Sequence, residues 1–367
     1  MTADPMRLIV DATAVRENGG GLSTYAVALV GAWADTFPED ELIVAAGDAG
    51  GERLMRSVAD DVRVPSLGGR FIGLHALVPL LTRRIRAHAT LALVPSVPVL
   101  PSPVPIVSVV YDMRSWMHPE EFPIWVRAYR SLAHHYAFHR SARLITISER
   151  SRRDLAQVCR RGASKTDVIY PAADHVDAWP TAERGRHVVT FGHWTNKMPG
   201  MAIEAWGRAH RAARSANGWQ LHVVGVPEAG RAALLQTARA LGISDSVVVH
   251  GYLPDPEYQL LFTSASAVLM LSTFEGFGLP VVEAMRRGVH VIASRDAALQ
   301  EAGGECAVYV DDELGLSEAL RGVLDETPRV QRMIGSGLEW TREMTWAAMA
   351  AQVRDVVKRA VSASGRR

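Results

Sequence analysis

The sequence predicts an α/β protein built from two doubly wound domains. Short apolar runs alternate with amphipathic helical segments along almost the whole chain, which is typical of parallel sheets with helices on both faces. The alternation pauses at a polar, proline-containing stretch near residues 172–186 and then starts again. A chain of 367 residues is also long enough for two domains of ordinary size.

The first half of the chain contains apolar runs of strand length, each bounded by turn residues. We expect strands at residues 7–11, 42–46, 62–65, 91–95, 106–111 and 144–148. Helical patterns lie between them, among them residues 23–34, 71–88, 123–140 and 149–161. These elements predict an N-terminal domain that spans residues 1–178.

The second half repeats the alternation. We expect strands at residues 188–191, 221–226, 247–250, 267–271, 289–293 and 307–310, within a C-terminal domain of residues 179–345. The last helical pattern, residues 346–361, is expected to pack back on the N-terminal domain. Because ligands of doubly wound sheets bind beyond the carboxyl ends of the strands, we expect a cleft between the domains to hold the site.

Charge and composition restrict the partners of the protein. A net charge of +1 gives no case for nucleic-acid binding, but residues 62–165 carry 16 lysines and arginines against 5 acidic residues. That segment is interpreted either as solvated helix faces or as a surface that docks on anionic lipid or an anionic acceptor. The two cysteines, Cys159 and Cys306, have no metal or redox spacing and favour a reducing cytoplasm. The beginning of the chain lacks a signal-peptide pattern, and no uninterrupted apolar run approaches the ~18 residues of a membrane span, so we expect any membrane contact to be peripheral, at the inner face.

The stretch "STFEGFGLPVVEAM", residues 272–285, carries the main functional signal. Glu275 and Glu283 bracket a Gly-Phe-Gly-Leu-Pro turn that is typical of a helix start, with Pro280 at the first helical position and Glu283 in the first turn. A glycine-rich helix N-terminus favours anions. Two carboxylates beside a site suited to phosphate are therefore unexpected and require an explanation.

The longer stretch "FEGFGLPVVEAMRRGVHVIAS" resembles the nucleotide-sugar site of retaining glycosyltransferases of family 4, whose GT-B architecture has two facing Rossmann-like domains. Other segments resemble this family in the same order, among them "VDATAVRENGGGLSTYAVALV", "VVYDMRSWMHPEEF", "ARLITISERSRRDL" and "VVTFGHWTNKMPGMAIEAW". The resemblance covers nearly the whole chain.

The resemblance implies roles for the residues of the C-terminal domain. Glu283 would hold the ribose hydroxyls of the donor, Glu275 would lie against the transferred sugar, and Lys197 would contact the diphosphate. The family usually adds an arginine to the lysine loop, and here His193, Thr195 or Asn196 occupies the corresponding places, with His193 a candidate for the missing positive charge. The full expected donor site is Gly192, His193, Lys197, Gly276, Phe277, Gly278, Leu279 and Glu283.

The N-terminal domain is expected to supply the acceptor side. Gly19, Gly20 and Gly21 resemble the family's glycine loop, which contacts the diphosphate. Asp112 matches a family aspartate and joins Glu275 and Lys197 as an expected catalytic residue, whereas Tyr111 stands where the family commonly has histidine. Tyrosine, with a pKa of about 10, is a poor base at neutral pH. His118 is a further candidate for acceptor contact.

The resemblance implies a retaining, metal-independent transfer of a hexose, with mannose as the first choice. The donor would be a GDP- or UDP-linked sugar, with no other cofactor, and the acceptor a glycan, a lipid-linked molecule or a small molecule. Bacterial polysaccharide and O-antigen assembly would be the setting. Two alternatives remain open: a catalytically degenerate partner subunit, which the missing histidine and arginine favour, and a nucleotide-sugar epimerase of the same architecture, against which the paired glutamates argue.

Overall fold

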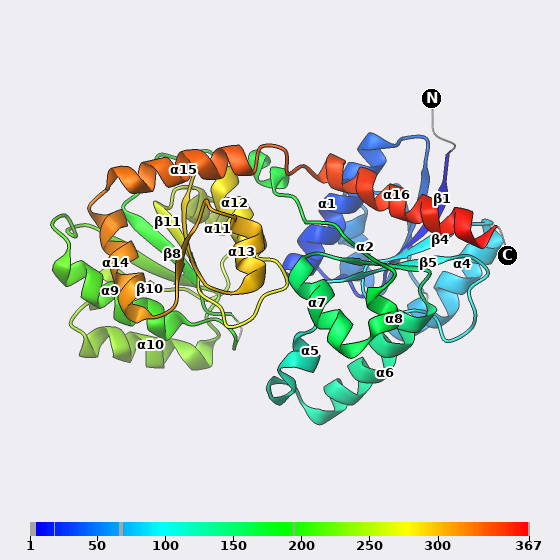
Figure 1. Ribbon diagram of the computed structural model, residues 1–367, viewed down its shortest axis with the longest axis horizontal. Helices are drawn as coiled ribbons and strands as arrows, with labels where there is room; N and C mark the ends of the chain where they lie inside the picture. The colour runs from blue at the N-terminus through cyan, green and yellow to red at the C-terminus, as the bar shows by residue number, and fades with distance from the viewer. Residues whose placement is uncertain (1–4, 18, 66–68, 194, 366–367) are drawn as a thin grey trace. The chain divides into compact units, whose positions relative to one another are not determined.

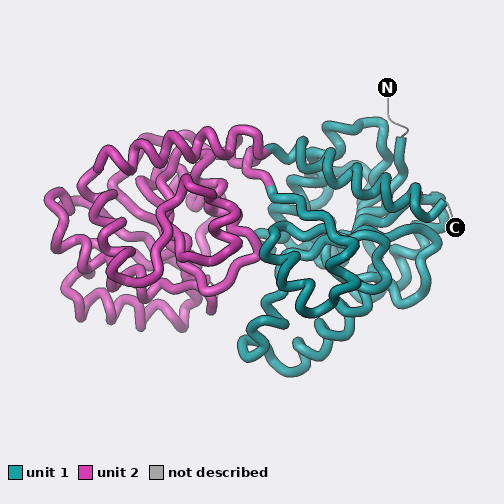
Figure 2. The backbone as a smooth tube through the Cα atoms, viewed as in Figure 1, with its two compact units in different colours: residues 1–171, 345–367 teal, residues 172–344 magenta. Residues whose placement is uncertain are grey.

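The chain forms two compact units (Figure 2). The computed structural model describes residues 5–17, 19–65, 69–193 and 195–365. Unit 1 comprises residues 1–171 and 345–367, and unit 2 comprises residues 172–344. The first boundary therefore lies at residue 171 rather than at 178, because the short helix η3 (Asp174–Ala178) packs against α12 (Leu279–Arg286) of unit 2.

The described strands of unit 1 form a seven-stranded sheet in the order β3-β2-β1-β4-β5-β6-β7. All neighbouring strands are parallel, as the alternating pattern predicted. Ile9 lies beside Ile43 and Val10 beside Leu91, and all four side chains are buried. The strands are β1 (Arg7–Ala12), β2 (Glu41–Ala46), β3 (Asp61–Arg63), β4 (Ala89–Ala92), β5 (Ile106–Val110), β6 (Arg143–Thr146) and β7 (Thr166–Val168). No strand was expected at β7, because its three residues include a threonine and an aspartate instead of an apolar run.

Helices link the strands of unit 1 (Figure 1). They are α1 (Gly21–Thr36), α2 (Ala49–Met55), α3 (Gly69–Ile72), α4 (Val78–Arg84), α5 (Arg114–Met117), α6 (Ile124–Arg140), α7 (Glu149–Val158) and α8 (Arg160–Ala163), with the short turns η1 (Gly73–Leu77) and η2 (Pro119–Glu121). The single helix expected at residues 71–88 is divided by the π-helical turn η1. Pro79 follows at the start of α4, and a proline cannot donate the hydrogen bond that a continuous helix needs.

The last helix, α16 (Trp346–Ser364), belongs to unit 1, where it packs against α1. Arg354 of α16 donates from Nε to Asp40 Oδ2 at 2.7 Å and from Nη2 to Asp40 Oδ1 at 2.8 Å. Asp40 also accepts from the Met6 amide and the Trp33 indole. Burial raises the pKa of Asp40, but these hydrogen bonds, first that from Arg354, outweigh it and hold the pKa below its ordinary value.

The described strands of unit 2 form a six-stranded parallel sheet in the order β10-β9-β8-β11-β12-β13. The chain runs outward from β8 to β10 and then returns to the other side of β8 at β11. The strand order therefore reverses between β8 and β11. The strands are β8 (His187–Phe191), β9 (Gln220–Val224), β10 (Val247–Val249), β11 (Ala267–Met270), β12 (His290–Ser294) and β13 (Val308–Val310).

The helices of unit 2 surround this sheet (Figure 1). Besides η3 and α12 they are α9 (Pro199–Ala212), α10 (Glu228–Ala240), α11 (Asp255–Thr263), α13 (Ala297–Gly303), α14 (Glu313–Leu324), α15 (Pro328–Trp340) and the turn η4 (Ser244–Ser246). Trp206, Leu269 and Leu320 are fully buried members of one hydrophobic core between sheet and helices. Within the described parts of either unit, no helix has both the length and the apolar character that crossing a bilayer requires.

Candidate functional site

The carboxyl ends of β8 and β11 are adjacent, at the point where the strand order of unit 2 reverses. Ligands of doubly wound sheets bind at such a switch point. The two loops that leave these strands are joined here: Lys197 and Ser272 form an antiparallel bridge, and the Thr273 amide donates to Asn196 O at 2.9 Å. Folding thus brings the loop that carries Lys197 to the loop that carries Glu275.

Lys197 and Glu275 form an ion pair at this switch point. Lys197 Nζ lies 2.6 Å from Glu275 Oε1, and the two side chains are only 5% and 16% exposed. The ring centroid of Phe191 lies 5.8 Å from the same nitrogen. A shielded ion pair of this kind keeps the ammonium group fixed in place, because either charge alone would be costly to hold out of water.

Asn196 fixes the loop around the pair. Its Nδ2 lies 2.7 Å from Ser272 Oγ, 2.8 Å from Phe274 O and 3.2 Å from Glu275 Oε1. Ser294 in turn accepts from the Ser272 amide at 2.9 Å. Asn196 therefore orients Glu275 and does not supply the positive charge of the family's arginine. The sequence offered no sign of the two serines, because each acts through a contact between distant loops.

His193 lies beside the ion pair but carries no charge at neutral pH. Burial, and then the nearby positive charge of Lys197, lowers the pKa of His193 to about 4, while Glu275 acts in the opposite direction. The imidazole is therefore neutral in the ligand-free protein. The expected role of His193 as a replacement for the missing arginine concerns a bound diphosphate and stays a prediction, because burial keeps only the ligand-free imidazole neutral.

The helix α12 begins at Leu279 after Gly278, which adopts a left-handed conformation with a φ of 104°. Pro280 is the second helical residue, not the first. Glu283 consequently lies at the start of the second turn, so its expected place in the first turn was wrong. Pro280 has no amide proton, and the Val281 amide already donates to Gly278 O at 2.9 Å. The helix start therefore offers an anion fewer amide donors than the sequence led us to expect.

Three further residues of the expected donor site line the same loops. The Gly192 amide donates to Val224 O, and a methyl group at Gly192 would lie 2.7 Å from Val226 Cγ2. Phe277 is 2% exposed, so its ring belongs to the core of unit 2. Gly276 is half-buried. Gly192 thus permits close packing against Val226. Because the Phe277 ring is buried in the core, only the backbone of Phe277 is available to a ligand.

Glu283 has a partner that the sequence analysis missed. His175 Nε2 lies 3.1 Å from Glu283 Oε1, with side chains that are 17% and 8% exposed. A second contact joins the same elements, since Arg286 donates to both carboxylate oxygens of Asp177, at 3.0 and 2.6 Å. Together these contacts hold η3 against α12. No local pattern in the polar stretch near residues 172–186 distinguishes His175 from an exposed loop histidine.

The expected glycine loop of unit 1 is only partly described, because it begins beside residue 18, which lies outside the described residues. Gly20 has a φ of 58° and precedes α1, which begins at Gly21. A methyl group at Gly19 would lie 2.2 Å from Ser23 Oγ, which donates to Arg16 O. The positive φ at residue 20 thus favours glycine there. Gly19 leaves room for the Ser23 side chain, which approaches it closely.

Tyr111 and Asp112 follow β5 in unit 1. Burial raises the pKa of Tyr111 well above its ordinary value, and no described residue forms a hydrogen bond with its hydroxyl group. Its ring packs edge-on against Tyr25, with 5.1 Å between centroids. Tyr111 is therefore unsuited to act as a base. Asp112 is exposed and accepts from the Arg114 amide at 2.9 Å, which is a turn-stabilising contact.

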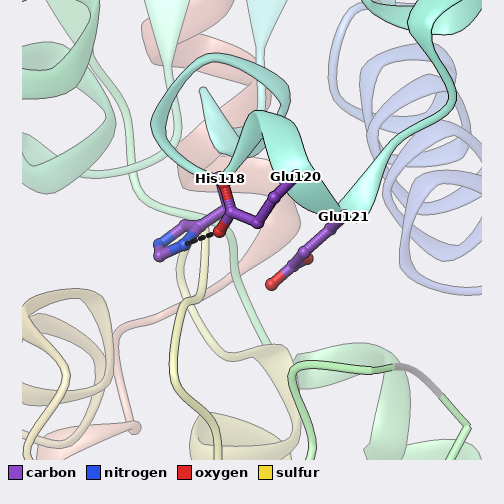
Figure 3. Close-up of side chains that lie close together, drawn as sticks. All are labelled: His118, Glu120 and Glu121. Atoms are coloured by element: carbon purple, nitrogen blue, oxygen red, sulfur yellow. Dashed lines mark hydrogen bonds and ion pairs between the residues drawn. The ribbon is translucent and has the colours of Figure 1, made fainter.

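His118 lies at the start of η2, next to Glu120 and Glu121 (Figure 3). His118 Nδ1 is 3.3 Å from Glu120 Oε1, and one ligand atom from each of the three residues lies within 4.8 Å of the others. Glu121 also forms an ion pair with Arg114. Arg114 therefore supplies a positive charge next to this group.

Asp11 is a buried carboxyl group that the sequence analysis did not single out. It ends the apolar run of β1 and is 1% exposed. Burial raises its pKa, although the Thr13 amide donates to Oδ1 at 3.0 Å. Its other oxygen, Oδ2, has no hydrogen-bond partner among the described residues. The sequence signal that could have identified Asp11 is a polar residue at the end of an apolar strand.

Comparison with known proteins gives this geometry a context. Residues 185–326 match the model of the family "Glycosyl transferases group 1". Over 131 residues the chain is 40% identical to the MMP alpha-(1->4)-mannosyltransferase of Mycolicibacterium hassiacum, which covers 33% of this chain and 31% of that protein. It is 29% identical to the O-antigen chain mannosyltransferase B of Escherichia coli over 29% of each chain. It is 24% identical to the O-antigen chain mannosyltransferase RfbU of Salmonella typhimurium over 58% of this chain and 59% of that protein. The chain thus spans about a third of the first two relatives.

Solved structures extend the likeness to nearly the whole fold. Anabaena Alr3699/HepE in complex with UDP-glucose has a TM-score of 0.76 at 17% identity, covering 96% of this chain and 99% of that one. WaaG, a glycosyltransferase involved in lipopolysaccharide biosynthesis, has a TM-score of 0.65 at 14% identity over the same shares. At these identities the likeness shows the fold alone. It confirms the two-domain, Rossmann-like α/β architecture expected from the sequence.

Proposed function

We propose that this chain, whose fold is GT-B and whose residues 185–326 form a group 1 glycosyl transferase domain, transfers a hexose from a nucleoside-diphosphate sugar to an acceptor. Mannose is the first choice, because the relatives in Mycolicibacterium hassiacum, Escherichia coli and Salmonella typhimurium are all named mannosyltransferases. GDP and UDP are both candidate carriers. The acceptor is a glycan, a lipid-linked molecule or a small molecule, in the setting of polysaccharide or O-antigen assembly.

The Lys197–Glu275 ion pair carries this proposal. It places one fixed cation and one hydrogen-bond acceptor together at the switch point of the unit 2 sheet. A nucleoside-diphosphate sugar presents the complementary groups, a diphosphate beside a ring of hydroxyls. In the proposed complex the ammonium group of Lys197 contacts the diphosphate and the carboxylate of Glu275 accepts from sugar hydroxyls. Glu283, held by His175, accepts from the ribose hydroxyls.

The chemistry asked of these residues is electrostatic. As the bond between the sugar and the diphosphate breaks, negative charge develops on the leaving group, and a lysine fixed beside that charge lowers the barrier. We infer retention of configuration and independence of metal ions from the resemblance to family 4. Tyr111 has a raised pKa and takes no proton at neutral pH. In the proposed reaction the leaving phosphate accepts the proton of the acceptor, and Asp112 orients the acceptor or its loop.

Calorimetric titration with UDP, GDP and ADP tests the donor site. We expect selective binding of one nucleotide by the wild type and a loss of at least tenfold in affinity in Glu283→Ala, because a charge-assisted hydrogen bond is lost. Glu228→Ala is the matched control, since the Glu228 side chain is 85% exposed on α10 of the same unit. Failure of the wild type to bind any of the three nucleotides would remove the proposed function.

A catalytically inactive partner subunit is the second candidate. The buried Tyr111 hydroxyl favours it, because the position where related enzymes carry histidine provides no base here. Nucleotide binding without turnover of GDP-mannose, UDP-glucose or related donors, with a panel of lipid and glycan acceptors, would support it. Release of nucleoside diphosphate together with a glycosylated acceptor supports the transferase instead, and an epimerised free nucleotide sugar would identify an isomerase.

A further inference from the structure

One face of α6 in unit 1 is apolar and uncovered. Trp125, Tyr129 and Leu132 are spaced by four and three residues, which places them in one row along the helix. They are 71%, 53% and 77% exposed, and Ile124 at the start of the helix is 79% exposed. Figure 1 shows α6 at the edge of unit 1, next to α5. A helix of a globular protein usually turns such a row toward the core.

The apolar surface continues beyond the helix. A groove of about 1060 Å³ lies along α6, and its lining includes Trp116, Leu132, Tyr136 and Val158. The Tyr136 hydroxyl group donates to Val99 O at 2.8 Å and so ties the neighbouring loop to the helix. Val99 and Leu100 on that loop are also exposed, at 66% and 60%. A contiguous exposed apolar surface of this kind marks an interaction site.

The charges around this surface are positive. α6 contains three arginines and no acidic residue. Arg140 is exposed and lines the groove, with its guanidinium group 5.9 Å from the centroid of the Tyr136 ring. Arg127, two residues after Trp125, lies on another side of the helix and acts on Glu120 instead. Arg140 forms no ion pair with any described residue, whereas Glu120 and Glu121, which precede the helix, are engaged by His118 and Arg114. The partner of this surface is therefore both apolar and anionic.

We propose that the α6 face, defined by Ile124, Trp125, Tyr129, Leu132 and Arg140, docks unit 1 on a bilayer with anionic headgroups. The apolar row enters the boundary between headgroups and acyl chains, where aromatic rings are favoured, and Arg140 contacts a lipid phosphate. A second copy of the chain is a poorer partner, because a two-fold interface through this face would place two positively charged surfaces against each other. The proposal concerns unit 1 alone and does not depend on the proposed donor site.

Vesicle flotation tests the surface with the full chain. We compare phosphatidylcholine vesicles with vesicles that contain phosphatidylglycerol, for the wild type, Trp125→Ser/Leu132→Ser and Arg140→Glu. The wild type is expected to float with the anionic vesicles and to dissociate at high salt. Loss of the two apolar side chains weakens binding at least tenfold, and loss of Arg140 weakens it about fivefold.

Tyr252→Ser is the matched control, because Tyr252 is 72% exposed on unit 2, outside the proposed surface. It is expected to bind vesicles as the wild type does. Thermal unfolding followed by circular dichroism shows whether every variant is folded. We expect all variants to fold, because the substituted side chains are exposed. Equal flotation of the wild type and Trp125→Ser/Leu132→Ser, or no flotation of the wild type, would overturn the proposal. Sedimentation that reveals a dimer abolished by the same double variant, without vesicle binding, would assign the surface to a second copy instead.

Discussion

His175 and Glu283, 108 residues apart in the sequence, are joined by a hydrogen bond of 3.1 Å inside unit 2. Both side chains are largely shielded from water, so the contact fixes the direction of the Glu283 carboxylate before any ligand arrives. The short helix η3 therefore orients a carboxylate on α12.

Replacement of His175 should weaken nucleotide binding, although in the proposed complex His175 does not itself contact the nucleotide. We expect His175→Ala to raise the dissociation constant of the preferred nucleotide about tenfold, because Glu283 loses the partner that orients it. His175→Gln, which retains a donor, should recover most of the affinity. Calorimetry measures both effects, and an unchanged dissociation constant in folded His175→Ala would assign His175 a purely structural role.

The Lys197–Glu275 pair should be coupled in stability as well as in function. Lys197→Met leaves the shielded Glu275 carboxylate without its main partner and should lower the free energy of unfolding by about 3 kcal/mol. The double variant Lys197→Met/Glu275→Gln should lose less than the sum of the two single variants. Urea unfolding of all four proteins gives the coupling energy, and additive losses would contradict the ion pair. Turnover of Lys197→Met should fall on the order of 10²-fold.

Gly278 should tolerate no side chain. Its φ of 104° disfavours any other residue, and a methyl group would lie 2.5 Å from Leu299 Cδ2. We expect Gly278→Ala to lower the free energy of unfolding by about 2 kcal/mol. Gly200→Ala is the control: a methyl group there meets no atom within 4 Å, and α9 should gain up to ~1 kcal/mol. Equal stabilities of the two variants would refute this account.

The Arg354–Asp40 contact should make the stability of unit 1 depend on pH in acid. The pKa of Asp40 lies below its ordinary value of 3.8 in the folded chain, so the unfolded chain binds the proton more readily. This stability is present above pH ~4 and is lost as the pH falls through the folded pKa. Arg354→Met should unfold about 3 kcal/mol more easily at pH 7. The difference from wild type, followed by urea unfolding, should shrink below pH 4, and a constant difference down to pH 2 would contradict the linkage.

His193 should take up a proton when a nucleoside diphosphate binds. Its pKa of about 4 leaves the free imidazole neutral, and an adjacent diphosphate would raise that pKa by stabilising the charged form. Calorimetry at pH 6 in buffers of different ionisation enthalpy measures the uptake. We expect uptake in the wild type and none in His193→Gln. Absence of uptake in the wild type would place His193 away from the phosphates.

The sequence was informative where the physics is local. Apolar runs identified strands such as residues 7–11 and 188–191, because a buried parallel strand needs side chains suited to both faces. Glycine and proline located the start of α12 to within two residues, and the paired glutamates marked its surroundings. The fold and the location of the candidate site follow from such patterns.

The remaining features depend on contacts that no local pattern encodes. His175 reaches Glu283 only after η3 packs on α12, and the neutral state of His193 is a consequence of burial. The strand β7 lies in the sheet without an apolar run of its own. The direct pairing of Lys197 with Glu275 required the joining of two loops that follow non-consecutive strands.

The return of the chain to unit 1 has a consequence for biosynthesis. Asp40 leaves the ribosome early, whereas Arg354, its buried partner, is synthesised only after the whole of unit 2. Unit 2 is thus complete while unit 1 still lacks α16, which reverses the usual order in which the N-terminal domain finishes first. Until then the nascent unit 1 exposes the α1 surface that α16 will cover.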